Sequence, residues 1–306
     1  TAVNAGSYTI TPTVGTLTAA NYDFTAFVDG TLTISKVHLT VTANDKTRTY
    51  GAANPAFMAT LNGFVNGETD AGLRSAGKLA GSPSFSGTGP SSTSTTTVGE
   101  YVITPAVGSL SATNYDFPVA NFVDGKLTIT KAHLTVTANN QSKSYDGAAF
   151  SPFTATLTGF ANGETEAGLR GSGALSGNAG FTGSASSAVN AGTYTITPTE
   201  NTLTATNYDF TVFNNGSLTI NKVHLTVTAD NQSKPYDGMV FSPFSATITG
   251  FVNNETVAEV SGYAGFAGSA VSAVNAGTYT ITPTPGTLSA TNYDFPAINF
   301  IAGTLT

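Results

Sequence analysis

One tetrapeptide, Asn-Tyr-Asp-Phe, occurs four times in this chain, and its spacing limits the folds that the sequence can adopt. Successive copies begin 93, 93 and 85 residues apart (114 − 21, 207 − 114 and 292 − 207), at residues 21–24, 114–117, 207–210 and 292–295. A motif that returns once per length of a small domain indicates tandem repeats. The tetrapeptide is therefore either a functional site present in every copy or a structural element that every copy needs.

Other motifs recur around it in a constant order. A complete unit runs from HLTVTA through a Tyr-Gly or Tyr-Asp-Gly turn, GF..NET, a variable stretch, AGTYTITP and NYDF to GTLTI. This order predicts the C-terminal half of a truncated repeat at 1–36, a Tyr-Gly repeat module at 37–131, and Tyr-Asp-Gly modules at 132–222 and 223–306. Because Thr1 begins inside the pattern, we expect the chain to be part of a longer protein.

Length varies mainly in one part of the repeat. The interval from the Glu of GF..NET to the Tyr of AGTYTITP spans 68–101, 164–194 and 255–279 in the three modules. Insertions are tolerated where the backbone is exposed, which predicts a surface loop or sheet edge there. Two copies of NYDF are followed by Pro118 or Pro296 and two extra residues, which predicts a local bulge.

The segments between the turns alternate apolar and polar residues, which is typical of half-buried strands. Leu39 and Val41 alternate with Thr40 and Thr42, and the AGTYTITP and GTLTI motifs alternate in the same way. Residues 162–171 instead favour a short helix that Gly171 ends. The sequence therefore predicts a mostly β fold: a tandem array of small modules of about 90 residues, β-sandwich or β-grasp-like, each with at most one short helical turn.

The composition excludes several classes of function. Charged residues make up only 9% of the chain, the formal net charge is −7, and there is no cysteine. Nucleic-acid binding would need a basic face, so no nucleic-acid partner is expected. Disulfides and thiolate metal sites are impossible, and no apolar run in this segment is long enough for a membrane span.

The joins between modules contain no flexible linker. The last strand of one module passes through ISKVH, ITKAH or INKVH directly into the first strand of the next. Such joins predict a stiff rod of repeats. The expected partners are neighbouring repeats or protomers, through strand pairing or end-to-end packing.

Taken together, these motifs resemble those of the MBG and YDG repeats of large bacterial surface proteins. The segments that carry the resemblance are LTVTANNQSKSYDG (134–147), GFANGET (159–165), AGTYTITP and NYDF with NGSLTI. The resemblance implies an extracellular, secreted location on the bacterial cell surface and a role in the stalk or filament body of an adhesin. It implies no catalytic residue.

Residue types that could carry chemistry are better explained by structure. His38, His133 and His224 occur once per repeat, whereas a metal site needs several convergent ligands, so we interpret them as strand-entry residues. The Asp of NYDF and the Asp29 and Asp124 of VDG could bind calcium. Position 29 becomes Asn215 and Ala302 in other copies, which favours turn-forming Asx hydrogen bonds.

Tyrosines are the strongest structural signal. Of the twelve, only Tyr263 lies outside a repeated motif. We predict that the Tyr rings of GTY and NYD are buried and that their hydroxyls bond backbone groups. NYDF is interpreted as a corner in which Asn and Asp form the turn.

A nucleophile needs a nearby base, and the only His residues lie at module joins. No phosphate-binding loop occurs. The sequence therefore predicts a protein that is not an enzyme, with no catalytic, cofactor-binding or metal-binding residue and no cofactor. The alternative to a structural stalk is that the modules bind glycans or a host surface protein. The variable loops favour the stalk, because a shared binding site would not tolerate them.

Two further expectations concern particular positions. Lys36, Lys131 and Lys222 recur in register with Glu68, Glu164 and Glu255, but they lie at module joins, so no isopeptide crosslink is predicted. The half-unit at 1–36 would expose an apolar face and unpaired strand edges. We expect it to be ordered only where a neighbouring protomer or the upstream part of a longer protein supplies the missing strands. Hydrogen exchange that protected residues 8–11 as well as 194–197 in the isolated chain would contradict this.

Overall fold

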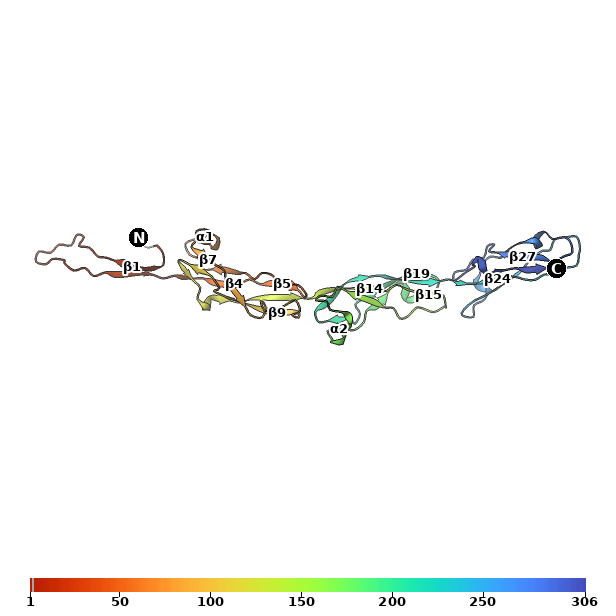
Figure 1. Ribbon diagram of the computed structural model, residues 1–306, viewed down its shortest axis with the longest axis horizontal. Helices are drawn as coiled ribbons and strands as arrows, with labels where there is room; N and C mark the ends of the chain where they lie inside the picture. The colour runs from red at the N-terminus through yellow and green to blue at the C-terminus, as the bar shows by residue number, and fades with distance from the viewer. Residues whose placement is uncertain (2) are drawn as a thin grey trace. The chain divides into compact units, whose positions relative to one another are not determined.

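Short strands form most of the regular structure in the computed structural model, which describes residues 1 and 3–306 (Figure 1). The chain divides into two compact units. One consists of Thr1–Ala132, Phe160–Ala174 and Ala205–Asp209, and the other consists of His133–Gly159, Leu175–Thr204 and Phe210–Thr306. The boundary between the units runs through the second repeat. The module boundaries read from the sequence remain predictions.

The N-terminal segment forms one antiparallel hairpin of β1 (Gly6–Ile10) and β2 (Gly30–Ile34). The first complete repeat contains these elements: β3 (Val37–His38), β4 (Thr40–Ala43), β5 (Lys46–Thr49), β6 (Ala59–Asn62), α1 (Asp70–Ser75), β7 (Leu79–Ala80), β8 (Ser84–Ser86), β9 (Gly99–Ala106), β10 (Ser111–Ala112), β11 (Tyr115–Asp116), η1 (Val119–Asn121), β12 (Phe122–Val123) and β13 (Gly125–Thr130).

The second and third repeats follow the same plan. The second contains β14 (Ala132–Ala138), β15 (Gln141–Ser144), β16 (Ala155–Thr158), α2 (Glu166–Gly171), β17 (Leu175–Ser176), β18 (Gly180–Thr182), η2 (Ser184–Ser187), β19 (Gly192–Thr199), β20 (Thr204–Ala205), β21 (Tyr208–Asn214) and β22 (Gly216–Asn221). The third contains β23 (Val223–His224), β24 (Thr226–Ala229), β25 (Ala246–Thr249), η3 (Val257–Glu259), β26 (Gly265–Ala267), η4 (Ser269–Ser272), β27 (Tyr279–Thr284), β28 (Tyr293–Asp294), η5 (Ala297–Asn299), β29 (Phe300–Ile301) and β30 (Gly303–Leu305).

Each complete repeat contains two larger sheets. In the first repeat they have the strand orders β12-β4-β6 and β5-β13-β9-β8. Both are mixed, because β4 runs parallel to β12 and β5 runs parallel to β13, whereas the other pairings are antiparallel. The variable interval begins after GF..NET and includes β8, which lies at a sheet edge as predicted. The mostly β fold of repeated modules of about 90 residues with few short helices is confirmed.

The predicted alternation matches the burial of the strands. Leu39 and Val41 are fully buried, whereas Thr40 and Thr42, which alternate with them, are half-buried. Together with leucines from β6, α1 and β7, they form the first core of this repeat. Because successive side chains of a strand point to opposite faces, the period-two pattern was enough to place these residues.

The short helix begins at a threonine of the NET motif. The Thr165 hydroxyl accepts a hydrogen bond from the Gly168 amide, which satisfies one of the unpaired donors of the first turn of α2. Leu169 is the buried residue of this helix. The helix includes Gly171 and is capped by Ser172, one residue later than predicted. The third repeat has only the 3-10 turn η3 at this place, and 3-10 turns occur elsewhere in all three repeats. The prediction of at most one helical turn per module was therefore too strict.

Two local predictions were wrong. The proline after NYDF does not introduce a bulge, because Pro118 and Pro296 each cap a 3-10 turn that leads into the next strand. The NYDF motif is not a corner either. Its Tyr and Asp form a strand, such as β11, that pairs in parallel with the Val-His strand at the start of the same repeat, such as β3. In the first repeat the Val37 and Leu39 amides donate to the carbonyls of Asn114 and Asp116, so the motif is extended.

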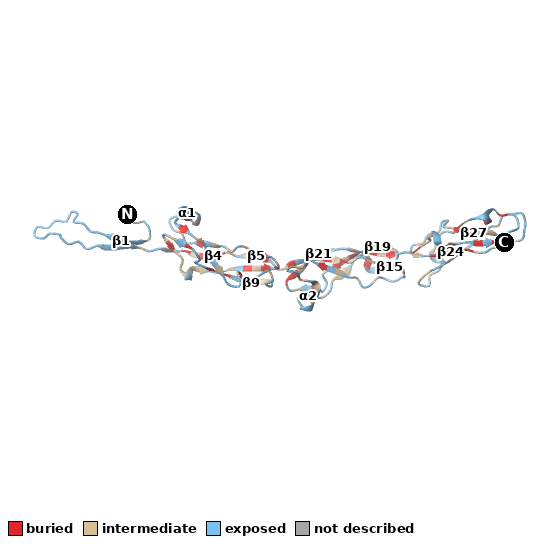
Figure 2. Cartoon of the chain, viewed as in Figure 1, coloured by how far each residue is buried: buried red, intermediate tan, exposed pale blue. Residues whose placement is uncertain are grey.

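The same motif is exposed in the N-terminal hairpin. Tyr22 is 82% exposed, whereas its counterpart Tyr115 is 1% exposed. Figure 2 shows this hairpin in pale blue, and large apolar residues such as Ile10 and Leu32 are exposed on it. Burial of the NYDF tyrosine therefore needs the remainder of the repeat. No helix in the part of the chain that the structure describes is long and apolar enough to cross a membrane.

One glycine position gives a matched test of packing. A Cβ on Gly125 would lie 2.4 Å from the Ala43 carbonyl oxygen, whereas a Cβ on its counterpart Gly30 would meet nothing nearer than 3.8 Å. We expect Gly125→Ala to destabilise the first repeat by about 1–3 kcal/mol, because backbone must move to admit the methyl group. Gly30→Ala is the control and should change stability by no more than about 0.5 kcal/mol. Hydrogen exchange of the β4 and β13 amides measures the effect of Gly125→Ala, and exchange of the β1 and β2 amides measures that of Gly30→Ala. Equal loss of protection in the two variants would contradict the prediction.

Candidate interaction sites at the repeat junctions

A glutamate from the NET motif accepts hydrogen bonds from tyrosines of two successive repeats. Tyr50, which follows β5 of the first repeat, donates its hydroxyl to Glu164 Oε1 of the second repeat at 2.7 Å. Tyr208 of the second repeat donates to the other oxygen, Glu164 Oε2. Both oxygens of one carboxylate are therefore occupied, one by each repeat. All three residues belong to the same compact unit.

The next junction repeats this arrangement inside the second unit. Tyr145 follows β15 and donates to Glu255 Oε1 at 2.5 Å, and Tyr293 donates to Glu255 Oε2. In each junction the two tyrosine rings meet edge to face, with centroids 5.5 Å apart for Tyr50 and Tyr208 and 5.8 Å apart for the second pair. Such contacts add to the stabilisation from buried area. We call each set a Tyr–Glu–Tyr junction.

The turn after the first tyrosine must be small. A Cβ on Gly147 would lie 2.4 Å from Asn253 Nδ2 of the next repeat, and its φ of 71° is in the left-handed region. Gly51 of the first repeat is equally close, because its Cβ would lie 2.4 Å from that of Ala161. Close approach of the next repeat therefore explains the Gly of the Tyr-Gly and Tyr-Asp-Gly motifs.

The Asn of NYDF bonds the backbone of the preceding repeat. The Val98 amide donates to Asn207 Oδ1 at 3.1 Å, and the Ala191 amide donates to Asn292 Oδ1 at 2.8 Å. The Asn292 carbonyl also accepts from the Val223 amide at 3.0 Å. The motif is thus a strand with three roles: Asn joins the repeats, Tyr reaches the carboxylate and Asp faces the Val-His strand.

Histidine and lysine of the join sequences also have specific partners. His38 Nδ1 lies 2.5 Å from Asp116 Oδ1, and His224 pairs with Asp294 in the same way. Lys131 Nζ donates to the Ala205 carbonyl at 2.8 Å. His38 and His224 lie in the strands β3 and β23 that open their repeats, as predicted. No group of three or more His, Asp or Glu residues that could hold a metal ion occurs within residues 1 and 3–306.

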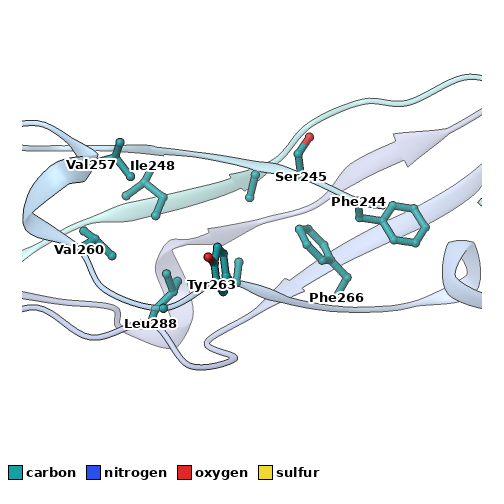
Figure 3. A pocket seen from close by; sticks show the side chains of 11 residues that line it. Phe244, Ser245, Ile248, Val257, Val260, Tyr263, Phe266 and Leu288 are labelled. Carbon is teal, nitrogen blue, oxygen red and sulfur yellow. The ribbon is translucent and has the colours of Figure 1, made fainter. Parts of the chain in front are cut away.

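The third repeat contains a pocket beside β25 and β26. Its volume is about 510 Å³, and its lining includes Ile248, Val257, Val260, Tyr263 and Phe266 (Figure 3). The segment from the NET glutamate to the Gly that opens the Gly-Phe strand is six residues shorter in the third repeat than in the second. It spans 255–265 in the third repeat (265 − 255 = 10) and 164–180 in the second (180 − 164 = 16). The deletion removes the helix that carries buried Leu169 in the second repeat. Ile248 and Leu288 of its lining are the counterparts of Leu61 and Leu110, which share a core cluster with Leu73 of α1 in the first repeat.

The sequence profile of the MBG domain (YGX type) family matches three consecutive segments, residues 39–128, 134–219 and 225–306. Together they cover more than half of the chain. The chain belongs to the MBG domain family of the YGX type. The resemblance read from the motifs is thereby confirmed, and the three complete units are tandem MBG repeats.

Other comparisons add little to this assignment. No curated protein matches the MBG chain. Among solved structures, the crystal structure of Drosophila N-cadherin EC1-4 is similar over 93% of this chain and 80% of its own, at 9% sequence identity and a TM-score of 0.20. A likeness of that size carries no argument about the MBG repeats.

The first MBG repeat differs from the others in the turn that carries its tyrosine. In the second repeat Lys143 pairs with Asp146 of the Tyr-Asp-Gly turn. The first repeat has no Asp there, and Arg48 replaces the lysine. Its buried guanidinium donates to Asn54 Oδ1 at 2.8 Å and to the Thr93 carbonyl at 2.5 Å. The variable loop of this repeat is therefore fastened to the turn.

Burial and the shared carboxylate alter the acid–base behaviour of the junctions. Burial, and then the hydrogen bond to Glu255, raise the pKa of Tyr293 to about 12. The hydrogen bonds from Tyr145 and Tyr293 lower the pKa of Glu255. The junction therefore favours a neutral tyrosine beside an ionised glutamate.

Because the pKa of Tyr293 is raised in the folded protein, we expect the free energy of unfolding to decrease at alkaline pH. The unperturbed pKa of tyrosine is 10.0 and that of folded Tyr293 is about 12, so the unfolded state releases this proton first as the pH rises. The contribution of the raised Tyr293 pKa to the free energy of unfolding is fully present below pH 10 and is lost as the pH rises through about 12. Thermal unfolding of wild type and Tyr293→Phe across this range should show a weaker pH dependence for the variant. Tyr263→Phe, at an 84% exposed position, is the control and should behave as wild type.

Sequence reasoning located the tyrosines but missed their main partner. The GTY tyrosines bond backbone carbonyls as predicted, for example Tyr194 to Asn190 O at 2.9 Å, but their rings are only half-buried. The NYD tyrosines of the three complete repeats are buried and their hydroxyls bond backbone groups as predicted, but each hydroxyl also donates to a NET glutamate. Tyr22 of the hairpin is exposed, contrary to the prediction. The signal was available, because Glu68, Glu164 and Glu255 recur in register with the tyrosines. Lys36 also has a partner other than a glutamate, since its Nζ donates to the Ala112 carbonyl at 2.7 Å.

Proposed function

We propose that this chain is a non-catalytic structural segment of the stalk or filament body of a bacterial surface adhesin, outside the cell. Its tandem MBG repeats belong to no catalytic family. The observation that carries the proposal is the Tyr–Glu–Tyr junction, which occurs in both units with the same atoms. A carboxylate that accepts hydrogen bonds from two repeats joins each repeat to the next. Interfaces between neighbouring repeats of this kind stabilise an array of repeats.

Continuity of the cores supports the same role. One cluster of buried residues contains Ile196, Leu218 and Ile220 of the second repeat together with Leu225 and Tyr293 of the third. Packing of this kind across a join resembles a domain interior more than a flexible interdomain contact. The join therefore has both apolar packing and a specific polar contact.

Small-angle scattering tests the mechanical part of the proposal. We expect a radius of gyration well above the value of about 19 Å that a compact domain of this length would have. A double variant, Glu164→Ala with Glu255→Ala, should show greater flexibility while its repeats remain folded. Glu100→Ala is the control, because Glu100 pairs with Lys126 within one repeat. A radius near the compact value for wild type would contradict the stalk.

The extracellular part of the proposal needs a separate measurement. Antibodies raised against the 306-residue chain should label intact cells of the source organism without permeabilisation. Labelling that appeared only after permeabilisation would contradict a surface location.

A second candidate function is ligand binding by the third repeat. The observation in its favour is the pocket of about 510 Å³, which is lined mainly by apolar side chains, includes the exposed Tyr263 and is within the usual size range of ligand sites (Figure 3). A glycan array probed with wild type and Tyr263→Ala tests it. Saturable binding that the substitution abolishes would favour this candidate, and absence of binding would remove it.

A further inference from the structure

A helix that contributes to the core of two repeats is missing from the third. α1 and α2 each bury one leucine, Leu73 or Leu169, which are 5% and 8% exposed. In the first repeat this leucine belongs to one core cluster with Leu61, Leu79 and Leu110. The third repeat is six residues shorter at this place, as described above, and its turn η3 has no buried residue. No side chain of η3 therefore replaces the helix leucine.

The positions around that leucine differ in burial between the repeats. They are buried in both repeats that have the helix, as Leu61, Leu79 and Leu110 in the first and as Leu157, Leu175 and Leu203 in the second. Their counterparts in the third repeat, Ile248, Val260 and Leu288, are only half-buried. These three side chains converge on the pocket of about 510 Å³ (Figure 3). The pocket thus exposes residues that a leucine helps to bury in the other repeats.

A polar contact of the helix also has its acceptor in this pocket. In the first repeat Arg74, which follows the helix leucine, donates from Nη1 to the Gly81 carbonyl at 2.7 Å, while its Nε pairs with Asp70 at 2.9 Å. Gly262, the counterpart of Gly81, belongs to the lining of the pocket. Among the residues that the structure describes, none donates to the Gly262 carbonyl. The acceptor that the arginine uses is therefore open.

The backbone around the pocket has the same arrangement as in a repeat with a helix. The Thr287 amide donates to the Tyr263 carbonyl at 3.0 Å, as the Ser109 amide donates to the Ser82 carbonyl at 2.9 Å in the first repeat. The pocket is therefore formed before any ligand binds, and a preformed site avoids part of the ordering cost of association.

We infer that the third repeat binds a short amphipathic helix of a partner protein, which places a leucine in the pocket and the following arginine on the Gly262 carbonyl. The intact repeats show the pattern of this occupant, since α1 and α2 share the sequence Ala-Gly-Leu-Arg after an acidic residue. Docking of a helix in an apolar groove is a common mode of peptide recognition. The leucines of α1 and α2 are buried in their own repeats, so the occupant comes from another protein. The inference rests on ligand binding by the third repeat, the second candidate function, and names a protein helix as the ligand.

A peptide with the sequence of residues 162–175, NGETEAGLRGSGAL, carrying Gly171→Ala is the probe. It contains α2, and the substitution favours the helix at a position where an added Cβ meets nothing within 4 Å. Added to the 306-residue chain, it should cause saturable chemical-shift changes at the amides of β25 and of residues 260–263. The amides of β6 and β16 are internal controls and should not change, because their repeats already have the helix.

Variants of the peptide test the two predicted contacts. Leu169→Ala in the peptide should weaken binding at least about ten-fold, because burial of a leucine side chain contributes more than one ten-fold step in affinity. Arg170→Gln should weaken it at least about three-fold, since a charged donor to the Gly262 carbonyl is lost. Asn162→Ala, outside the helix, is the control and should bind as the parent peptide does.

Variants of the chain supply a second arm. Replacement of residues 257–259 by the sequence of residues 166–174, EAGLRGSGA, gives the third repeat its own helix and should abolish peptide binding. Val257→Asp, at a 61% exposed position of the lining, should weaken binding, whereas Val123→Asp, at a 46% exposed position of the first repeat, should not. The peptide variants keep the test valid if the helix replacement does not fold.

No saturable binding, equal shift changes in all three repeats, or binding that ignores Leu169→Ala would overturn the inference. A glycan that binds the third repeat when the peptide does not would also overturn it, while the second candidate function would hold. The stalk is tested separately, because a chain that binds no peptide can still give an extended scattering curve.

Discussion

Replacement of the buried NYDF tyrosine should destabilise its repeat strongly, whereas the same substitution in the hairpin should have almost no effect. Tyr208→Ala removes a ring that is 1% exposed, packs on Phe160 and Tyr50 and reaches Glu164. Truncation of a buried aromatic residue typically costs about 3–5 kcal/mol. Hydrogen exchange of the second repeat's amides measures the loss repeat by repeat, which suits an array that need not unfold in one step.

Tyr22→Ala is the matched control, because it changes the same letter of the same motif at an 82% exposed position. Its effect should be no larger than about 0.5 kcal/mol. A large effect at Tyr22, or a small one at Tyr208, would show that the motif acts through its local conformation and not through the core and the junction.

Loss of the shared carboxylate should have the next largest effect. Glu164→Ala leaves the hydroxyls of Tyr50 and Tyr208 without their acceptor. A buried polar group left unpaired costs about 1–3 kcal/mol. The Tyr208 hydroxyl retains the Ala161 amide as a donor at 2.9 Å, so we expect about 2–4 kcal/mol in total. Glu164→Gln should lose less, because its amide oxygen can still accept one of the two bonds.

A double-mutant cycle shows whether this energy couples the repeats. The cycle combines Tyr50→Phe in the first repeat with Glu164→Ala in the second. Two residues that share a hydrogen bond usually show an interaction energy of about 0.5–3 kcal/mol in the free energy of unfolding. The exposed Glu200 of the second repeat is the control, and Tyr50→Phe with Glu200→Ala should be additive. Additivity in the first pair would mean that the junction contact contributes nothing to the joining of repeats.

The sequence by itself determined the features that depend on local pattern. The 93-residue period, the alternation of Leu39 and Val41 with threonines, and the short helix after NET follow from turn residues, strand pleat and helix capping. The strand alternation and the short helix are each encoded within a few consecutive residues, and the period is read from the recurrence of short motifs. Recurrence also marked the tyrosines as structural positions, although it did not pair them with the NET glutamates.

Only the tertiary structure decided what the recurring polar residues do. Tyr50 and Glu164 are 114 residues apart and lie in different repeats, so no local rule could pair them. NYDF looked like a turn because Asn and Asp favour turns in isolation, but parallel pairing with the Val-His strand outweighs that preference. The two NYDF copies at Tyr22 and Tyr208 have identical letters and opposite burial. Burial depends on the strands that surround the motif, and these come from distant parts of the chain.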